Sequence, residues 1–418
     1  MVFITMKLGN LSKQAKAWIF YDGGNSAFAT TVLAAFFPIF FKEYWSSGIN
    51  DLEATSYLGI GLTISNLALL FTAPFIGAIT DLSRTTKKFF IGLTLLAIIF
   101  VATLFFVPAG SWLMALVFFG IANYCFAAGN ILYDKMIVFV SDASNLSRIS
   151  SFGFAFGYLG GGILFLVNAI MTLKPEWFFL TNSADAVRWS FLSVSIWWLL
   201  FLIPISLSVI DNHNNRFQVK TIFYSFKQVM GTINQVSHNK KIFLFLLAFF
   251  LYIDGVHTIM AMASDFALNL NLSSSAVIIG LILVQFVAFP STLGWAWLAN
   301  KYSDINILLV TIFLYLLIIA YSVRLSNASE FYILASLVGA VQGGIQAISR
   351  SYFAKIIPHD KSGEYFGFFN MFGRAGAFMG PAMVALAVTV YPDPRVGLIP
   401  IALLFVLGGY CLLKVKNL

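Results

Sequence analysis

Long apolar runs, separated by short polar gaps, make up most of the chain. A helix needs about 20 mostly apolar residues to cross the hydrocarbon core of a bilayer. The length of the runs favours helices over the strands of a membrane barrel, because such strands alternate apolar and polar residues over about ten positions. We therefore predict an all-α membrane protein with twelve transmembrane helices. The runs cover residues 18–41, 56–80, 89–107, 112–140, 151–172, 189–210, 242–267, 275–298, 306–324, 331–354, 364–390 and 397–414.

Basic residues in the gaps predict which way the helices run, because cytoplasmic loops of membrane proteins are enriched in Lys and Arg. The gaps on the same side as the N-terminus contain Lys7, Lys13, Lys16, Arg84, Lys87, Lys88, Arg148, Arg216, Lys220, Lys227, Lys240, Lys241, Lys301, Lys355, Lys361, Lys414 and Lys416. The opposite gaps contain only Lys42, Lys174, Arg188, Arg324 and Arg395. This bias predicts that both termini are cytoplasmic, as an even number of helices also requires.

An internal repeat divides the chain into two halves. Residues 21–26 read Tyr-Asp-Gly-Gly-Asn-Ser, and residues 252–258 read Tyr-Ile-Asp-Gly-Val-His-Thr. Each string lies in the first half of an outward-running predicted helix, although chance similarity between apolar segments is the alternative. The repeat predicts two pseudo-symmetric six-helix bundles, residues 1–210 and 242–418, joined by a cytoplasmic linker over 211–241. Within the linker, residues 221–236 are expected to form a short helix on the membrane surface.

Composition supports a membrane protein and excludes several other classes. Of the 418 residues, 60% are hydrophobic and 10% are charged, whereas soluble domains are about 25% charged. The net charge of +8 does not indicate a nucleic-acid partner, because the basic residues recur in the gaps instead of clustering. Cys125 and Cys411 lie in apolar segments and predict no disulfide framework. We expect no metal site and no cofactor, since the four histidines and these two cysteines lack ligand spacing.

Ionisable residues inside the predicted helices are the candidates for function, because each is costly at the bilayer centre and needs a partner or a wet cavity. Asp254 and His257 lie one turn apart, where they can exchange a proton. Asp254 is also a candidate for contact with the substrate. The alternative is a structural carboxylate at a helix break, with His257 bonding a neighbouring helix. Asp22 and Asn25 are candidates for substrate contact or for structural hydrogen bonds. Arg374 is a candidate to hold a substrate carboxylate, or else a protein acid such as Asp254 or Asp22.

A second set of charges is predicted near the cytoplasmic ends of equivalent helices. Asp134 and Arg350 fall there in the fourth and tenth predicted helices, and Arg148 and Glu364 fall at the starts of the fifth and eleventh. A network of these residues across the two halves would act as a gate and favour an outward-open state. The alternative is that each side chain extends separately to the membrane surface.

Several motifs resemble a known transporter family. The segment Gly77 to Lys88 resembles the loop signature of the major facilitator superfamily, with Gly77, Asp81, Arg84, Lys87 and Lys88 fitting the pattern and Leu82 departing from it. The strings at 21–28, 252–259, 341–351 and 363–368, together with Gly380-Pro381, are similar to the vacuole-effluxer-like branch of that superfamily. That branch includes fungal vacuolar amino-acid effluxers and bacterial permeases. The resemblance implies the two-bundle fold and transport by alternating access.

The leading hypothesis is a secondary transporter of a small polar metabolite, an amino acid or related carboxylate, with proton coupling. We expect a monomer in the bacterial inner membrane, whose partners are the substrate, protons and lipid. An exporter or flippase of a more hydrophobic compound or lipid on the same fold is one alternative. A membrane-bound enzyme is another, disfavoured because no convergent catalytic set is visible.

Overall fold

The computed structural model describes residues 11–142, 144–208, 220–270, 272–391 and 393–418. Within this part of the chain, twelve helices are long and apolar enough to cross a membrane, and each corresponds to one predicted apolar run. The prediction of an all-helical, twelve-span protein is therefore confirmed. The first span is built from α1 (Lys13–Ala27), η3 (Phe28–Phe36), α2 (Phe37–Phe40) and η4 (Phe41–Trp45). The other spans are α3 (Asp51–Ser83), α4 (Thr86–Thr103), α5 (Trp112–Val140), α6 (Leu146–Leu173), α7 (Ser183–Ser208), α9 (Lys240–Asn269), α10 (Ser274–Ala299), α11 (Asp304–Ser322), α12 (Ala328–Ile356), α13 (Ser362–Val390) and α14 (Leu398–Lys416).

Several helices begin before the apolar runs that predicted them, because polar residues cap their first turns. Ser12 accepts a hydrogen bond from the Ala15 N–H at 3.0 Å, and Asn327 accepts one from the Glu330 N–H at 3.0 Å. Such caps satisfy N–H groups that have no partner within the helix. Hydropathy marks only the part of a helix that lies in hydrocarbon, so the capped turns lie beyond the predicted boundaries.

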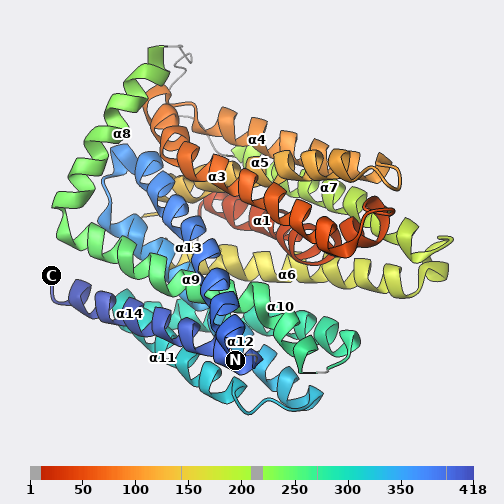
Figure 1. Ribbon diagram of the computed structural model, residues 1–418. Helices are drawn as coiled ribbons and strands as arrows, with labels where there is room; N and C mark the ends of the chain where they lie inside the picture. The colour runs from red at the N-terminus through yellow and green to blue at the C-terminus, as the bar shows by residue number, and fades with distance from the viewer. Residues whose placement is uncertain (1–10, 143, 209–219, 271, 392) are drawn as a thin grey trace.

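The two halves lie side by side, with α1 to α7 in one and α9 to α14 in the other (Figure 1). They meet mainly along α3 with α13 and α6 with α10, and α6 also contacts α12 while α5 contacts α13. The connecting segment contains α8 (Lys220–His238), which confirms the short helix predicted there and lies crosswise at one end of the bundle. The first residues of the predicted linker, 211–219, lie outside the described residues.

The internal repeat has a geometric counterpart at glycine contacts in the two halves. In the first half, the Cβ of any larger residue at Gly160 would lie 2.5 Å from the carbonyl oxygen of Gly23. In the second half, a Cβ at Gly380 would collide with the hydroxyl of Thr258. Each repeated Asp-Gly string thus packs closely against the fifth helix of its own half, as small residues permit in membranes.

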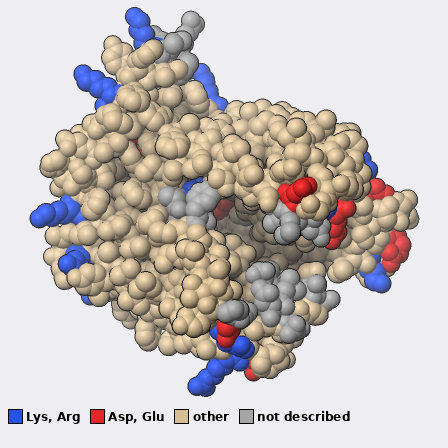
Figure 2. Space-filling model, in the orientation of Figure 1, with Lys and Arg blue, Asp and Glu red and all other residues tan. Residues whose placement is uncertain are grey.

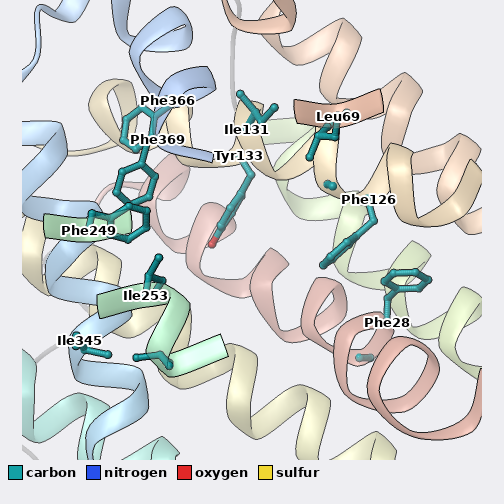
Figure 3. Packing of buried hydrophobic residues seen from close by; sticks show 14 of the residues in the cluster. Phe28, Leu69, Phe126, Ile131, Tyr133, Phe249, Ile253, Ile345, Phe366 and Phe369 are labelled. Carbon is teal, nitrogen blue, oxygen red and sulfur yellow. The ribbon is translucent and has the colours of Figure 1, made fainter. Parts of the chain in front are cut away.

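Aromatic side chains fill the core on both sides of the seam, which is the contact surface between the two halves (Figure 3). In the first half, the rings of Phe28 and Phe126 lie 4.7 Å apart. In the second, Phe249 stacks on Phe369 with 3.9 Å between the ring centroids. Such pairs add to the stability of the packing beyond the effect of the area that they bury.

The segment predicted as a loop with the superfamily signature is mostly helical. Gly77 and Asp81 lie in the last turns of α3, and Lys87 and Lys88 lie in the first turn of α4. Only a two-residue turn separates these helices, and Arg84 occupies it in the left-handed conformation with φ of 52°. The prediction of a loop was wrong because charge and glycine content resemble a loop even where a helix continues past the membrane surface.

Candidate substrate cavity and the seam between the halves

A cavity of about 1300 Å³ lies between the two halves and is lined by residues of both. Figure 2 shows the hollow on the side of the molecule away from α8. Its walls come from α1, η3, α3, α5 and α6 on one side and from α9, α10, α12 and α13 on the other. A site that both halves share is what a transporter needs if the halves rock about the substrate.

Arg374 of α13 lines this cavity. Its Nη1 donates to the amide oxygen of Asn66, on α3 of the other half, at 3.2 Å. Within the described part of the chain, no carboxylate lies within 4.0 Å of this guanidinium. The structure therefore places Arg374 in the cavity and without an ion pair to Asp22 or Asp254, the acids named as its alternative partners.

His257 and Asp254 of α9 point to different surroundings. His257 lines the cavity, and its Nδ1 has no hydrogen-bond partner among the described residues. Asp254 is fully buried outside the cavity lining, and its Oδ1 accepts from the Gly380 N–H at 3.0 Å and from the Thr258 hydroxyl at 3.5 Å. The Asp254 carboxylate is thus separated from the cavity, where we had expected it to meet substrate, and no described hydrogen bond joins it to His257.

Asp22 and Asn25 of α1 lie on the opposite wall. Both line the cavity, and the Asn25 amide donates to Asp22 Oδ1 at 3.5 Å. Gly157 of α6 packs against the Asp22 carboxyl group, where an added Cβ would lie 3.3 Å from its Cγ. The repeat partners Asp22 and Asp254 therefore differ in access to the cavity, since only Asp22 faces it.

Amide side chains give this cavity an excess of hydrogen-bond acceptors. Asn123, Asn130 and Gln285 line it, and the side-chain oxygen of each is buried with no partner among the described residues. Buried polar groups without partners are uncommon in proteins and call for an explanation. A bound molecule with N–H or O–H groups would satisfy them.

An ion pair across the halves lies in the wall of the cavity. Arg350 of α12 lies 3.1 Å from the Asp134 carboxylate of α5. Its guanidinium also donates to the hydroxyl and the carbonyl oxygen of Ser150, both at 2.9 Å. Asn370 of α13 donates to the second Asp134 oxygen at 3.1 Å. All four residues belong to one buried network that links α5 and α6 to α12 and α13.

Aromatic rings surround this guanidinium. Arg350 lies 4.7 Å from the Trp18 ring centroid and 4.2 Å from that of Phe154. Trp18 stacks on Tyr133 with 4.3 Å between centroids. A cation over an aromatic face is stabilised when water is excluded. Gly153 leaves room for the arrangement, because an added Cβ would lie 2.9 Å from the Trp18 ring.

The signature residue Asp81 forms a second link between the halves. Its carboxylate lies 2.7 Å from the Lys135 ammonium of α5. It also accepts from the backbone N–H groups of Gly363 and Glu364, at 3.1 and 2.9 Å, in the first turn of α13. A negative charge at a helix N-terminus interacts favourably with the unpaired N–H groups there. Asp81 therefore holds α13 against α3.

The remaining predicted gate residues lie outside the Arg350–Asp134 pair. The Glu364 carboxylate accepts from the side-chain amide of Gln228, on α8, at 3.0 Å. The guanidinium of Arg148 lies 5.9 Å from the Phe152 ring centroid. A further link that the sequence did not indicate joins Ser147 of α6 to Lys355 and Asp304, over 2.7 and 3.2 Å.

Lys135, Ser150, Asn66 and Asn370 were missed by the sequence reasoning. Lys135 follows Asp134 directly inside an apolar run, so its charge was available as a signal. The other three are uncharged and carry no such signal, because polar residues of this kind are tolerated in membrane helices in many roles.

Comparisons with known proteins agree with this geometry. A family model described as vacuole effluxer Atg22 like matches residues 140–417. The chain is 34% identical over 399 residues to YxiO of Bacillus subtilis, described as an uncharacterized MFS-type transporter, and the match covers 95% of this chain and 93% of that protein. The chain belongs to the Atg22-like family of major facilitator transporters. The resemblance drawn from the motifs is confirmed, and membership indicates a transport function.

Fungal members and solved structures extend the comparison. Autophagy-related protein 22-1 of Penicillium rubens is 25% identical over 285 residues, which cover 62% of this chain and 47% of that protein. The chain thus matches about half the length of the fungal relative. Among solved structures, the proton:xylose symporter XylE superposes with a TM-score of 0.71 at 13% identity, over 96% of this chain and 95% of that one. FucP in the outward conformation gives 0.71 at 11%, over 96% and 97%. These structures show that the fold is shared.

Proposed function

We propose that this protein is a secondary transporter that moves a small zwitterionic metabolite, of the amino-acid class, by alternating access. The observation that carries the proposal is Arg374, a cavity-lining guanidinium that donates to the amide oxygen of Asn66 and has no described carboxylate within 4.0 Å. A substrate carboxylate would complete its coordination with two parallel hydrogen bonds. A charge that entered this cavity without such a partner would lose its hydration uncompensated.

The opposite wall suits the ammonium group of the same molecule. Asp22 supplies a negative charge, and Asn25 lies beside it. The unpartnered amide oxygens of Asn123 and Asn130 belong to the same half and would accept further donors. A positive pole on one half and an acceptor-rich pole on the other favour a zwitterion over a simple anion or a sugar.

Proton coupling is assigned to Asp254 and His257. The second carboxylate oxygen of Asp254 is buried without a described partner, which makes it a place where a proton can be carried. His257 faces the cavity one turn away and can pass a proton between the cavity and α9. In this scheme Asp254 acts in coupling, while Asp22, Asn25 and Arg374 contact the substrate.

The Arg350–Asp134 pair is proposed as the gate on the α8 side. With this pair made, the cavity opens away from α8, as an outward-open state requires if the termini are cytoplasmic. Release of the pair would let the halves separate on the α8 side. We place the protein in the cytoplasmic membrane of a bacterium, in agreement with its relative from Bacillus subtilis.

Counterflow into proteoliposomes tests the substrate class. Amino acids would be compared with amines of the same side chain that lack the carboxylate and with acids that lack the ammonium group. We expect exchange of the zwitterion and at least about a tenfold loss for either analogue, since a charged hydrogen bond contributes about 1.5–3 kcal/mol. Equal exchange of the amine would overturn the assignment of Arg374 to a substrate carboxylate.

A further inference from the structure

The helix α8 has four different faces. Ser225, Val229, Thr232 and Val236 are buried and share one face at helical spacing. This face packs on α3, and Val229 forms an apolar cluster with Ala78 of α3 and Phe368 of α13. The helix therefore covers the line where the two halves meet on this end of the molecule.

One flank of α8 is apolar and exposed. Phe223 is 78% exposed and Phe226 is 58% exposed, and Met230 and Ile233 continue the same flank. Phe226 stacks on Phe75 of α3 with 5.5 Å between ring centroids. Phe75 continues the exposed ridge of α3 that contains Phe71, 70% exposed. Because that ridge belongs to a membrane-spanning helix, the apolar flank of α8 is continuous with the surface that faces lipid.

The face of α8 away from the bundle is basic. Lys220 and Lys227 lie on it and are exposed, and Lys240 and Lys241 follow in the first turn of α9. The sequence of α8 contains no Asp or Glu. Lys and Arg side chains at this end project from the surface (Figure 2). An apolar flank beside an unbalanced basic face is the arrangement of a helix that lies in the interface of an anionic membrane.

The fourth face connects α8 to the first turn of α13. Gln228 donates to the Glu364 carboxylate at 3.0 Å, and Lys361 donates to the Gln235 side chain at 2.9 Å. Glu364 is the residue whose backbone N–H is held by Asp81. The position of α8 is thus tied to the closed seam between α3 and α13.

We propose that α8 is a binding surface for the headgroups of anionic phospholipids, and that its occupation stabilises the state in which the α3–α13 seam is closed. The lipid phosphates contact Lys220 and Lys227 while the apolar flank enters the boundary of the acyl chains. Lipid then holds α8 in the position that bridges α3 and α13. Binding is independent of the transported substrate, and only the effect on the seam rests on alternating access.

The binding half of the proposal is tested by hydrogen exchange. The purified protein is placed in nanodiscs of phosphatidylcholine alone and of phosphatidylcholine with phosphatidylglycerol at a ratio of about 7:3. We expect slower exchange of the α8 amides with the anionic lipid, reversed by high salt because exposed charges are screened. Equal exchange in both lipids overturns the proposal. Protection that appears only on addition of a cell extract would assign the surface to a protein and also overturns it.

The conformational half is tested by alkylation of a cysteine in the seam. Ala78→Cys, in a background with Cys125→Ser and Cys411→Ser, becomes reactive when α3, α8 and α13 separate, because Ala78 is fully buried between them. We expect about threefold to tenfold slower alkylation in the anionic nanodiscs, since each Lys near such a surface contributes about 1 kcal/mol.

Charge variants decide whether α8 causes this effect. The double variant Lys220→Gln/Lys227→Gln should no longer show slower alkylation in the anionic nanodiscs. The double variant Lys220→Arg/Lys227→Arg should still show it, because it keeps both positive charges. Lys414→Gln/Lys416→Gln is the matched control, because it removes the same charge from exposed positions in the last turn of α14. An equal loss in this control, or an unchanged lipid effect in the α8 Gln variant, would overturn the role of α8.

Discussion

Asp134 and Arg350 lie 3.1 Å apart although 216 positions separate them in the chain. The pair joins α5 of the first half to α12 of the second, and both residues line the cavity. A buried ion pair contributes little net stability over apolar packing, but its disruption leaves an uncompensated charge. Its position therefore suits a contact that forms and breaks as the halves rock.

Removal of Arg350 is expected to open the side of the molecule that carries α8. Arg350→Ala leaves the Asp134 carboxylate with the Asn370 amide as its remaining hydrogen-bond partner among the described residues. The closed state should lose about 3–5 kcal/mol. Ser151→Cys on α6, fully buried in this state, should then be alkylated faster. Arg324→Ala, exposed on a predicted outer loop, is the control. An unchanged rate in Arg350→Ala would remove the gate role.

Gly77→Ala is also expected to open the side of the molecule that carries α8, by a steric collision alone. The new Cβ would collide with the carbonyl oxygen of Gly363, across the α3–α13 seam. Backbone atoms cannot rotate away, so the seam must widen. Alkylation of Ala78→Cys reports the change. Gly92→Ala is the matched control, since no atom lies within 4 Å of its added Cβ. Identical behaviour of the two variants would show that the seam does not need this close approach.

Substrate affinity is expected to follow the geometry of residue 374. Arg374→Ala should weaken binding about tenfold to a hundredfold, because a charged hydrogen-bonding partner is lost. Arg374→Lys keeps the charge without the two-pronged geometry and should lose less. Calorimetry on the purified variants, with Arg324→Ala as control, measures the difference. Equal affinity in all of them would mean that the cargo need not carry a carboxylate.

Asp254→Asn is expected to abolish accumulation driven by a pH gradient while exchange remains. The Asn oxygen can still accept from the Gly380 N–H, so the contact between α9 and α13 is retained. Thr258→Val removes the other hydrogen bond to Asp254 but leaves the titratable carboxylate in place. Transport by this variant should therefore remain coupled to protons. Concentrative uptake by Asp254→Asn in proteoliposomes would show that this carboxylate is structural.

Topology reporters test the orientation of the whole molecule. Fusions after Leu418 and insertions near Asn214 should both report the cytoplasmic side, because basic residues cluster in the gaps of that side. A periplasmic or extracellular signal at either place would reverse the assignment of the gate as cytoplasmic.

The sequence identified the charged residues within the helices but did not predict the surroundings of each one. The cost of burying charge marked Asp134, Arg350 and Arg374 as candidates, and the equivalent positions of the first two suggested a link between halves. The same reasoning did not distinguish Asp22, which faces the cavity, from Asp254, which faces Gly380. A repeated motif predicts equivalent places on two helices but not which of them the neighbouring helix covers.

The number and the approximate positions of the membrane-spanning helices were determined by the sequence itself. Lipid solvates the outside of every span, so the length of each apolar run is sufficient to predict a helix without knowledge of its neighbours. Only the tertiary structure decided the partners within the seam, such as Asp81 with the first turn of α13 and Asn66 with Arg374. Those contacts depend on how two bundles dock, and docking is set by close packing at glycines and by polar atoms that must find partners away from water.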